Sequence, residues 1–326
     1  MRFKLISNRQ ELELKKINDC FAFANEAYRV FSDEVKVLDP RVFESHPNMD
    51  SLLANLEMDK KGDPLKIHFV QSLNLWLFGE HRFFYICLRL QQLMDMAPTE
   101  NLSLINWDQH EDFNPIRGFE LFIDAGKPDE FENILSVENI IPMLYHQYQS
   151  VGIASYVYPF IWDGSLKNMM WRRNSKVALN GVSQHTYNFN FNPKINIYEF
   201  NRTYNVDRQL EFYDLVRTKR SNFKKLLTEL SPTHFLHTLD MDSFYVTFKN
   251  LVSKTRMNIF KQDLGLIETM PEVYPKGIFV ATTPGDYTNP RTIQALTREV
   301  LSYYKSLETA LSQQENTDMQ LMSEGR

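Results

Sequence analysis

Short apolar runs that alternate with longer segments of helical periodicity most constrain how this chain of 326 residues can fold. The apolar runs predict buried strands, at residues 73–78, 102–107, 153–161, 235–239 and 277–281, with shorter runs at 177–179 and 195–200. Apolar residues at helical spacing predict helices, at residues 83–96, 207–230, 255–266 and 291–311. This alternation indicates an α/β fold with a mainly parallel sheet.

The two ends of the chain show weaker patterns than its middle. Residues 11–31 have loose helical spacing, and residues 39–64 carry the Pro, Asn and Gly residues of a surface segment. The last residues are polar and lack the apolar content of a core. We therefore expect a single domain over residues 1–312, with residues 1–64 as an N-terminal extension packed on it and a disordered tail at residues 313–326.

Composition and charge limit the compartment and the partners. A net charge of −5 does not favour binding to nucleic acid. No stretch approaches the roughly 18 apolar residues of a membrane span, and the N-terminal residues lack the apolar region of a secretory signal. Cys20 and Cys87 have no metal-binding spacing and are expected as reduced thiols. We expect a cytoplasmic protein without nucleic-acid or membrane partners; the sequence leaves its oligomeric state open, a homo-oligomer included.

Polar clusters follow four of the predicted strands. They are Glu80-His81, Asp108-x-His110-x-Asp112, Asp163 and Asp240-x-Asp242. Ligands of parallel sheets bind at the carboxyl ends of the strands, so these side chains are expected to converge on one edge. Residues two apart in an extended segment project to the same side, which predicts that the alternate residues of each cluster point together.

The residue types in these clusters are those of a metal centre. Asp-x-His-x-Asp by itself also occurs as a polar loop with a capping Asp. Together with His81 and Asp240-x-Asp242 it supplies four carboxylates and two imidazoles. That set is too acidic for a structural zinc site, and it suits two divalent ions roughly 3.5–4 Å apart that share carboxylates. Mn²⁺ is the ion that such ligands favour.

The order His81, Asp108-Gln109-His110-Glu111-Asp112 and Asp240-Met241-Asp242 resembles the ureohydrolase branch of the arginase/deacetylase superfamily. The resemblance implies a three-layer α/β/α domain, arginase-like, with two Mn²⁺ per chain. It implies one ion held by His81, Asp108, Asp112 and Asp240, and a second held by Asp108, His110, Asp240 and Asp242. Asp108 and Asp240 would bridge the two ions, and Asp112 would also orient the attacking water.

Further segments are similar to one family of that superfamily, the peptide arginases. They are Glu80-His81, Tyr156-x-x-Pro159-x-x-Trp162-x-Gly164 and Thr283-Pro284-Gly285, and the similarity covers residues 66–290. It implies a hydrolase that converts arginine side chains of a ribosomally made precursor peptide into ornithine and releases urea. The expected partner is therefore an arginine-containing precursor peptide.

Two features of free-arginine arginases are missing. Where they have a Glu that holds the guanidinium, this chain reads Thr282-Thr283-Pro284-Gly285-Asp286, so Glu80 and Asp163 are the candidates for that contact. Their proton-shuttling His has no clear counterpart, and His146 and His185 are candidates only because they are unassigned. The remaining histidines are expected to be structural, namely His46, His68, His234 and His237.

Two other functions remain open at this stage. One is a hydrolase of the same superfamily that acts on a small guanidino compound, a formimino compound or an acylated amine. The other is a non-catalytic module that uses the acidic edge to bind a basic peptide.

Overall fold

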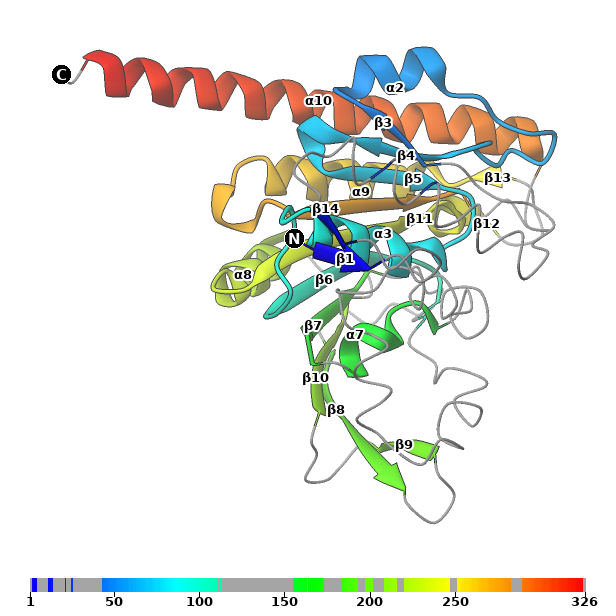
Figure 1. The fold of residues 1–326 in the computed structure, drawn as a ribbon, viewed down its shortest axis with the longest axis vertical. Coiled ribbons are helices and arrows are strands. Elements are labelled where there is room, and N and C mark those ends of the chain that lie inside the picture. Colours follow the sequence, from blue (N-terminus) through cyan, green and yellow to red (C-terminus); the bar gives the residue numbers. More distant parts are fainter. Residues whose placement is uncertain are drawn as a thin grey trace.

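A mostly parallel sheet of ten strands forms the centre of the molecule (Figure 1). The computed structural model describes residues 2–4, 11–13, 21, 25, 43–110, 112, 155–162, 164–172, 183–192, 197–201, 208–215, 220–246, 251–282 and 289–324. From edge to edge, the strands are β3 (Phe43–His46), β4 (Ile67–Val70), β5 (Leu75–Phe78), β14 (Gly277–Ala281), β11 (His234–Asp240), β6 (Leu102–Trp107), β7 (Leu166–Trp171), β10 (Arg208–Asp214), β8 (Ser183–Asn192) and β9 (Ile197–Asn201). The predicted α/β class is confirmed.

The strands from β5 to β10 in this order are all parallel to one another. Antiparallel pairs occur between β4 and β5, between β10 and β8, and between β8 and β9. At the other edge, β3 pairs in parallel with β4. Two small antiparallel pairs lie outside this sheet: β1 (Arg2–Lys4) with β2 (Glu11–Glu13), and β12 (Tyr245–Val246) with β13 (Leu251–Val252).

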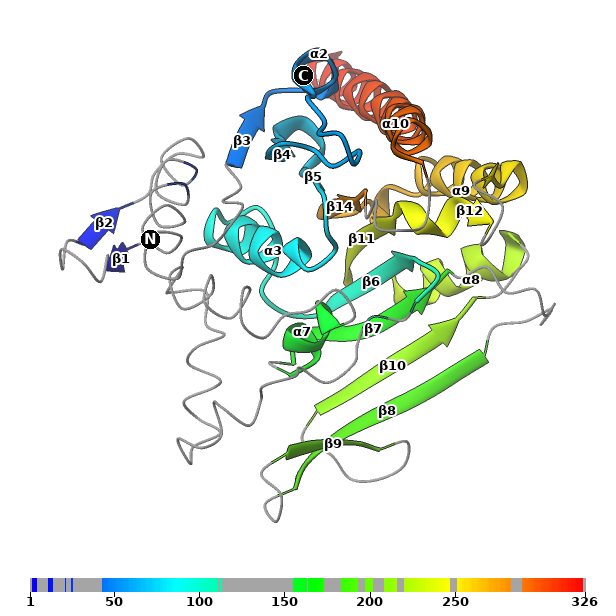
Figure 2. The same cartoon turned by 90° about the vertical axis from the view of Figure 1, so that its right-hand side faces the viewer.

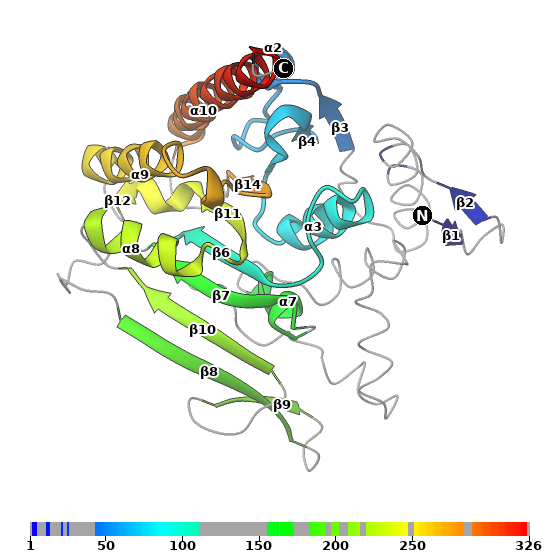
Figure 3. The ribbon, with the colours of Figure 1, turned by 90° about the vertical axis from the view of Figure 1, so that its left-hand side faces the viewer.

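Helices cover both faces of the sheet, as Figures 2 and 3 show from opposite sides. One face carries α3 (Phe83–Leu93) and α7 (Tyr158–Trp162); the other carries α8 (Arg220–Leu230), α9 (Lys254–Ile267) and α10 (Pro290–Glu324), with α2 (Met49–Asn55) beside α10. A hydrophobic core cluster joins sheet residues such as Ile105 and Leu239 to Phe260 of α9 and Tyr304 of α10. This arrangement is consistent with three layers.

Several local predictions are confirmed. β6 and β14 have the predicted bounds, and β5, β11, α3 and α9 lie within a few residues of theirs. These segments have mainly apolar runs or regular helical spacing, so the local pattern and the tertiary packing favour the same structure.

The strand predicted at residues 153–161 is wrong where the structure describes it, because Tyr158–Trp162 is helix α7. Its aromatic content favours a strand, but Pro159 suits the first turn of a helix. As a helix, the segment packs Phe160 edge-on against Phe84 of α3, with ring centroids 5.3 Å apart. Tertiary packing therefore outweighs the local preference.

The helix predicted at residues 207–230 is also wrong in its first half. That half is β10, in which Leu210 and Phe212 are buried and Glu211 between them is partly exposed. This alternation has the period of a strand. α8 begins only at Arg220.

The ends of the chain are more regular than expected. Residues 11–13 form β2 rather than the start of a helix. Within the stretch expected as surface, β3 joins the sheet, and α2 begins at the cap Asn48 and buries Met49 and Leu52. α10 continues to Glu324, through most of the tail that was expected to be disordered.

The order of the strands places a topological switch point between β6 and β11. From β6 the chain continues to its neighbour β7 on one side, and from β11 it continues to β14 on the other. Connections that leave adjacent parallel strands in opposite directions open a crevice at the carboxyl ends of those strands. Asp108 follows β6 directly, and Asp240 is the last residue of β11.

Candidate metal centre

Matching turns hold the two acidic clusters at the switch point. A carboxylate oxygen of Asp108 accepts a hydrogen bond from the backbone N–H of His110 at 2.8 Å. An oxygen of Asp240 accepts one from the N–H of Asp242 at 3.0 Å. Each Asp thus bonds the backbone two residues on, as Asp does in turns. These turns, and not an extended backbone as predicted, bring the alternate residues of each cluster together.

His81 forms the first group of possible metal ligands, with Asp108 and Asp240. Its Nδ1 atom lies 3.2 Å from an oxygen of Asp108, 3.4 Å from one of Asp240 and 3.7 Å from one of Asp112. All four residues are buried. Asp112 reaches this point with a left-handed backbone, φ 53°, a conformation that Asp tolerates better than most residues.

His110 forms the second group, with Asp108 and Asp242. Its Nδ1 atom lies 3.2 Å from an oxygen of Asp242 and 3.5 Å from an oxygen of Asp108. The side chain of His110 is 58% exposed, so this group opens to solvent. Asp108 belongs to both groups and uses one oxygen in each.

The spacing of these atoms fits bound ions. Ligand atoms roughly 2.0–2.2 Å from one ion in tetrahedral or octahedral geometry lie roughly 2.9–3.6 Å from one another. The contacts of His81 and His110 with Asp108, Asp240 and Asp242 fall in that range. Within the described part of the chain, neither ring nitrogen of His81 makes a well-formed hydrogen bond. His81 is therefore a buried imidazole that lies among carboxylates without a well-formed hydrogen bond to any of them. This arrangement leaves its ring nitrogens available to bind a metal ion.

The charges in the centre perturb each other strongly. Burial lowers the pKa of His81, but its contacts with Asp108 and other carboxylates outweigh burial and raise this pKa well above the usual range. Contacts with Asp108 and Asp242 raise the pKa of His110 to about 11. Burial, followed by the charge of Asp240, raises the pKa of Asp242 to about 7. Protons and imidazolium charges thus offset the repulsion between carboxylates, and a divalent ion would take their place.

The other two carboxylates respond in the same way. Burial and the nearby charge of Asp108 raise the pKa of Asp112. Burial also raises the pKa of Asp240, against the effect of His81. Asp108 differs, because its contacts with His110 and His81 outweigh burial and lower its pKa. It is the residue with an imidazole beside each of its oxygens.

A buried polar network orients the ligands of the first group. The ring of Tyr156 packs against that of His81, with centroids 4.2 Å apart. Its hydroxyl donates to the side-chain oxygen of Asn106 at 3.2 Å, and the Thr238 hydroxyl donates to the same oxygen at 2.7 Å. The indole N–H of Trp171 donates to the Asp108 carbonyl at 3.1 Å. Such outer contacts fix the orientation of metal ligands.

Sequence reasoning missed these supporting residues. Gln109, which lies between two of the predicted ligands, donates a hydrogen bond from its side-chain amide to the Asp242 carbonyl. Arg256 of α9 donates to the carbonyl of Ser243 at 3.0 Å and interacts electrostatically with Asp242. Nothing in the spacing of Asn106, Thr238 or Arg256 marked them, because their roles depend on which strands and helices are neighbours.

The two candidates for the guanidinium contact have different outcomes. Glu80 is partly exposed, and its carboxylate pairs with the guanidinium of Arg82 at 2.6 Å. Asp163 lies outside the described residues, as do His146 and the residues 283–286 after β14. The backbone of His185 lies in β8, and its side chain is outside the described part.

Neither the protein-family models nor the curated proteins that were compared with the chain match it. Among the described residues, no helix is both long enough and apolar enough to cross a membrane.

Proposed function

We propose that this protein is a binuclear manganese hydrolase that converts arginine side chains of a peptide into ornithine and urea. The observation that carries the proposal is the pair of His and Asp groups that share Asp108 at the switch point of a parallel sheet. Three ligand sources meet there: the loop after β5, the turn after β6 and the end of β11. The proposal also rests on the resemblance of the motifs to peptide arginases.

Two divalent ions held by these residues would supply an activated water at neutral pH. His81 and Asp112 would belong to one set of ligands and His110 and Asp242 to the other. Asp108 would belong to both sets, and so would Asp240 on the resemblance to ureohydrolases. Asp112 would also accept a hydrogen bond from the attacking water and aim it at the guanidinium carbon. Addition of the water oxygen to that carbon would give a tetrahedral intermediate. Its collapse would break the bond from the carbon to Nε, and a proton from the water would pass to the leaving amine.

The exposure of the centre supports a substrate that remains part of a peptide. His110 is the exposed member of the ligand set, so a long side chain can approach from that side while its backbone stays in solvent. Glu80, next to His81, already pairs with a guanidinium in this structure, that of Arg82. A substrate arginine that replaced Arg82 would meet the same carboxylate.

Mass spectrometry of an arginine-containing peptide tests the proposal. Incubated with the Mn²⁺-loaded protein, the peptide should lose CH₂N₂ per modified arginine, and urea should appear in equal amount. The matched variant Asp242→Asn should give neither product. Unchanged peptide masses with both ions bound would contradict the proposal, and urea release from free arginine or agmatine instead would assign a small-molecule substrate.

A further inference from the structure

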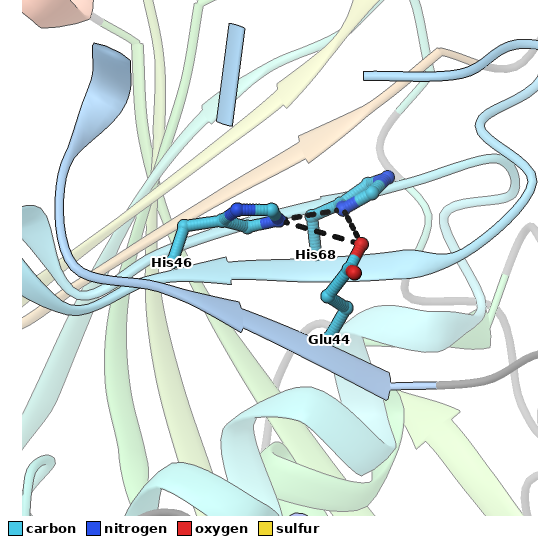
Figure 4. A group of neighbouring side chains, drawn as sticks. All are labelled: Glu44, His46 and His68. Carbon is cyan, nitrogen blue, oxygen red and sulfur yellow. Dashed lines mark hydrogen bonds and ion pairs between the residues drawn. The ribbon is translucent and has the colours of Figure 1, made fainter. Parts of the chain in front are cut away.

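Three side chains at the edge of the sheet form another cluster, which shares no residue with the centre described above. Glu44 and His46 lie on β3, and His68 lies on the neighbouring strand β4. Glu44 and His68 are direct partners in the register of the two parallel strands. Because residues two apart project to the same side of a strand, His46 joins them. Figure 4 shows the two imidazoles facing each other with the carboxylate beside them.

The three facing atoms form a small triangle. His46 Nε2 lies 3.0 Å from His68 Nδ1, and Glu44 Oε2 lies 3.4 Å from His68 Nδ1 and 3.7 Å from His46 Nε2. Nitrogen and oxygen ligands roughly 2.0–2.2 Å from a tetrahedral zinc ion lie roughly 3.3–3.6 Å apart. The 3.4 Å edge falls in this range, whereas the 3.0 Å edge is shorter and the 3.7 Å edge slightly longer. The triangle is therefore close in size to one face of a zinc tetrahedron.

Neighbouring groups aim the three atoms inward. The hydroxyl of Ser51 lies 3.4 Å from Nδ1 of His46, on the side of the ring away from the cluster. Lys66 pairs with Oε1 of Glu44 at 3.0 Å and leaves Oε2 to face the imidazoles. Oε2 is itself buried and, among the described residues, accepts no hydrogen bond. Metal-binding imidazoles and carboxylates are commonly oriented by such outer contacts.

We propose that Glu44, His46 and His68 bind a zinc ion. Two imidazoles and one carboxylate are a common set of three protein ligands for zinc, with water in the fourth position. His46 and His68 are buried, whereas the side chain of Glu44 is 33% exposed. The ion would fasten the four-residue edge strand β3 to β4.

The alternative is a histidine pair without metal. One imidazole N–H would then donate to the other ring at 3.0 Å, and Glu44 would pair with Lys66 alone. This arrangement leaves Oε2 of Glu44 and Nε2 of His68 buried without hydrogen bonds within the described part of the chain. A zinc ion would use the first of these two atoms.

Calorimetric titration of the metal-free full chain with Zn²⁺ tests the proposal. The titration uses a background with Asp108→Asn and Asp242→Asn, so that the other centre does not contribute. One equivalent of Zn²⁺ should bind, and the ion should raise the melting temperature. Adding His68→Gln should abolish both effects, and Glu44→Gln, at a partly exposed position, should weaken binding by roughly tenfold or more. His234→Gln, at an exposed histidine, is the matched control and should change neither.

Absence of zinc binding on the folded background protein would overturn the proposal, and so would binding that His68→Gln and Glu44→Gln leave unchanged. If the background fails to fold, elemental analysis of the zinc-loaded natural chain replaces the titration. Glu44→Gln should then lower the zinc content relative to His234→Gln, and equal contents would overturn the proposal.

Discussion

Asp108 is the residue on which the candidate centre depends most. One of its oxygens faces His81 at 3.2 Å and the other faces His110 at 3.5 Å. Its carboxylate is fully buried and its backbone carbonyl is held by Trp171. No other described candidate ligand contacts both imidazoles in this way, so a change at Asp108 should affect both proposed ion sites.

If the centre holds two manganese ions as proposed, Asp108→Asn should remove both, because an amide supplies one neutral oxygen where a carboxylate supplies two that share a negative charge. His110→Asn should remove the ion of the second group and leave that of the first. Elemental analysis of the purified variants measures both effects. Asp95→Asn is the matched control, since Asp95 is exposed and has a positive φ that Asn tolerates equally well. Equal metal contents in Asp108→Asn and the control would refute the shared-ligand interpretation.

His237 lies on β11, the strand that ends at Asp240, and its side chain packs in the core rather than in the candidate metal centre. Its ring lies among those of Trp107, Phe260 and Tyr304, at centroid distances of 6.0, 6.1 and 6.1 Å. Burial lowers the pKa of His237 from 6.5 to about 3. The folded protein therefore keeps this imidazole neutral at pH values where the unfolded chain protonates it.

The stability contributed by His237 should fall in acid. Below pH 6.5 the unfolded chain binds more protons at His237 than the folded protein does, so the free energy of unfolding decreases as the pH falls and levels off near pH 3. At pH 5 this decrease amounts to about 2 kcal/mol relative to pH 8. Urea unfolding of the metal-free protein at both pH values measures the free energy of unfolding. Its decrease from pH 8 to pH 5 should be smaller by this amount in His237→Leu than in the natural chain. His234→Leu, at the exposed start of the same strand, should behave like the natural chain; parallel pH profiles for all three would disprove the prediction.

At the scale of the elements, a buried ion pair joins the end of β7 to α9. Arg172 Nε contacts an oxygen of Asp263 at 2.8 Å, and both side chains are almost fully buried. The guanidinium also donates to the Leu215 carbonyl at 3.3 Å and lies over the rings of Trp107 and Phe223. The pair thus fixes the helix against the strand that adjoins β6.

We expect Arg172→Met to destabilise the fold by about 3–5 kcal/mol, because it leaves the carboxyl of Asp263 buried without its cation. The double variant Arg172→Met with Asp263→Leu should recover most of that loss, since a well-packed apolar pair avoids the cost of burying charges. Chemical unfolding measures both free energies. If the double variant is as unstable as the single one, the loss comes from packing and not from the uncompensated carboxyl.

At the scale of the whole molecule, the sheet gathers four carboxylates at one point. Asp108, Asp112, Asp240 and Asp242 are all buried, and they come from segments more than 100 residues apart in the sequence. Their mutual repulsion opposes folding unless protons or ions offset it. Metal binding and folding are therefore expected to be coupled.

Manganese should accordingly stabilise the whole domain. At a free concentration about 100 times the dissociation constant, each site should add about 2.7 kcal/mol to the free energy of unfolding. The melting temperature should rise by several degrees, and a chelator should reverse the rise. The variant with Asp108→Asn and Asp240→Asn should show no response to Mn²⁺. A response of the same size in that variant would place the stabilising ion elsewhere.

The sequence by itself determined the elements whose local pattern matches their packing. The apolar runs of β6 and β14 and the spacing of α9 are local properties, as is the placement of polar residues directly after the strands. Asp108, His110, Asp240 and Asp242 were identifiable for that reason, because ligands two residues apart in the chain stay close in any fold.

Only the tertiary structure decided which strands are neighbours and how the clusters bend. The pairing of β6 with β11 brings Asp108 beside Asp240, and Asp-centred turns rather than an extended backbone aim the ligands. The same holds for Glu44, His46 and His68, which meet through the register of β3 with β4. Strand order and register are set by burial and hydrogen bonding across the whole sheet, and a single segment of sequence carries too little of that information to fix them.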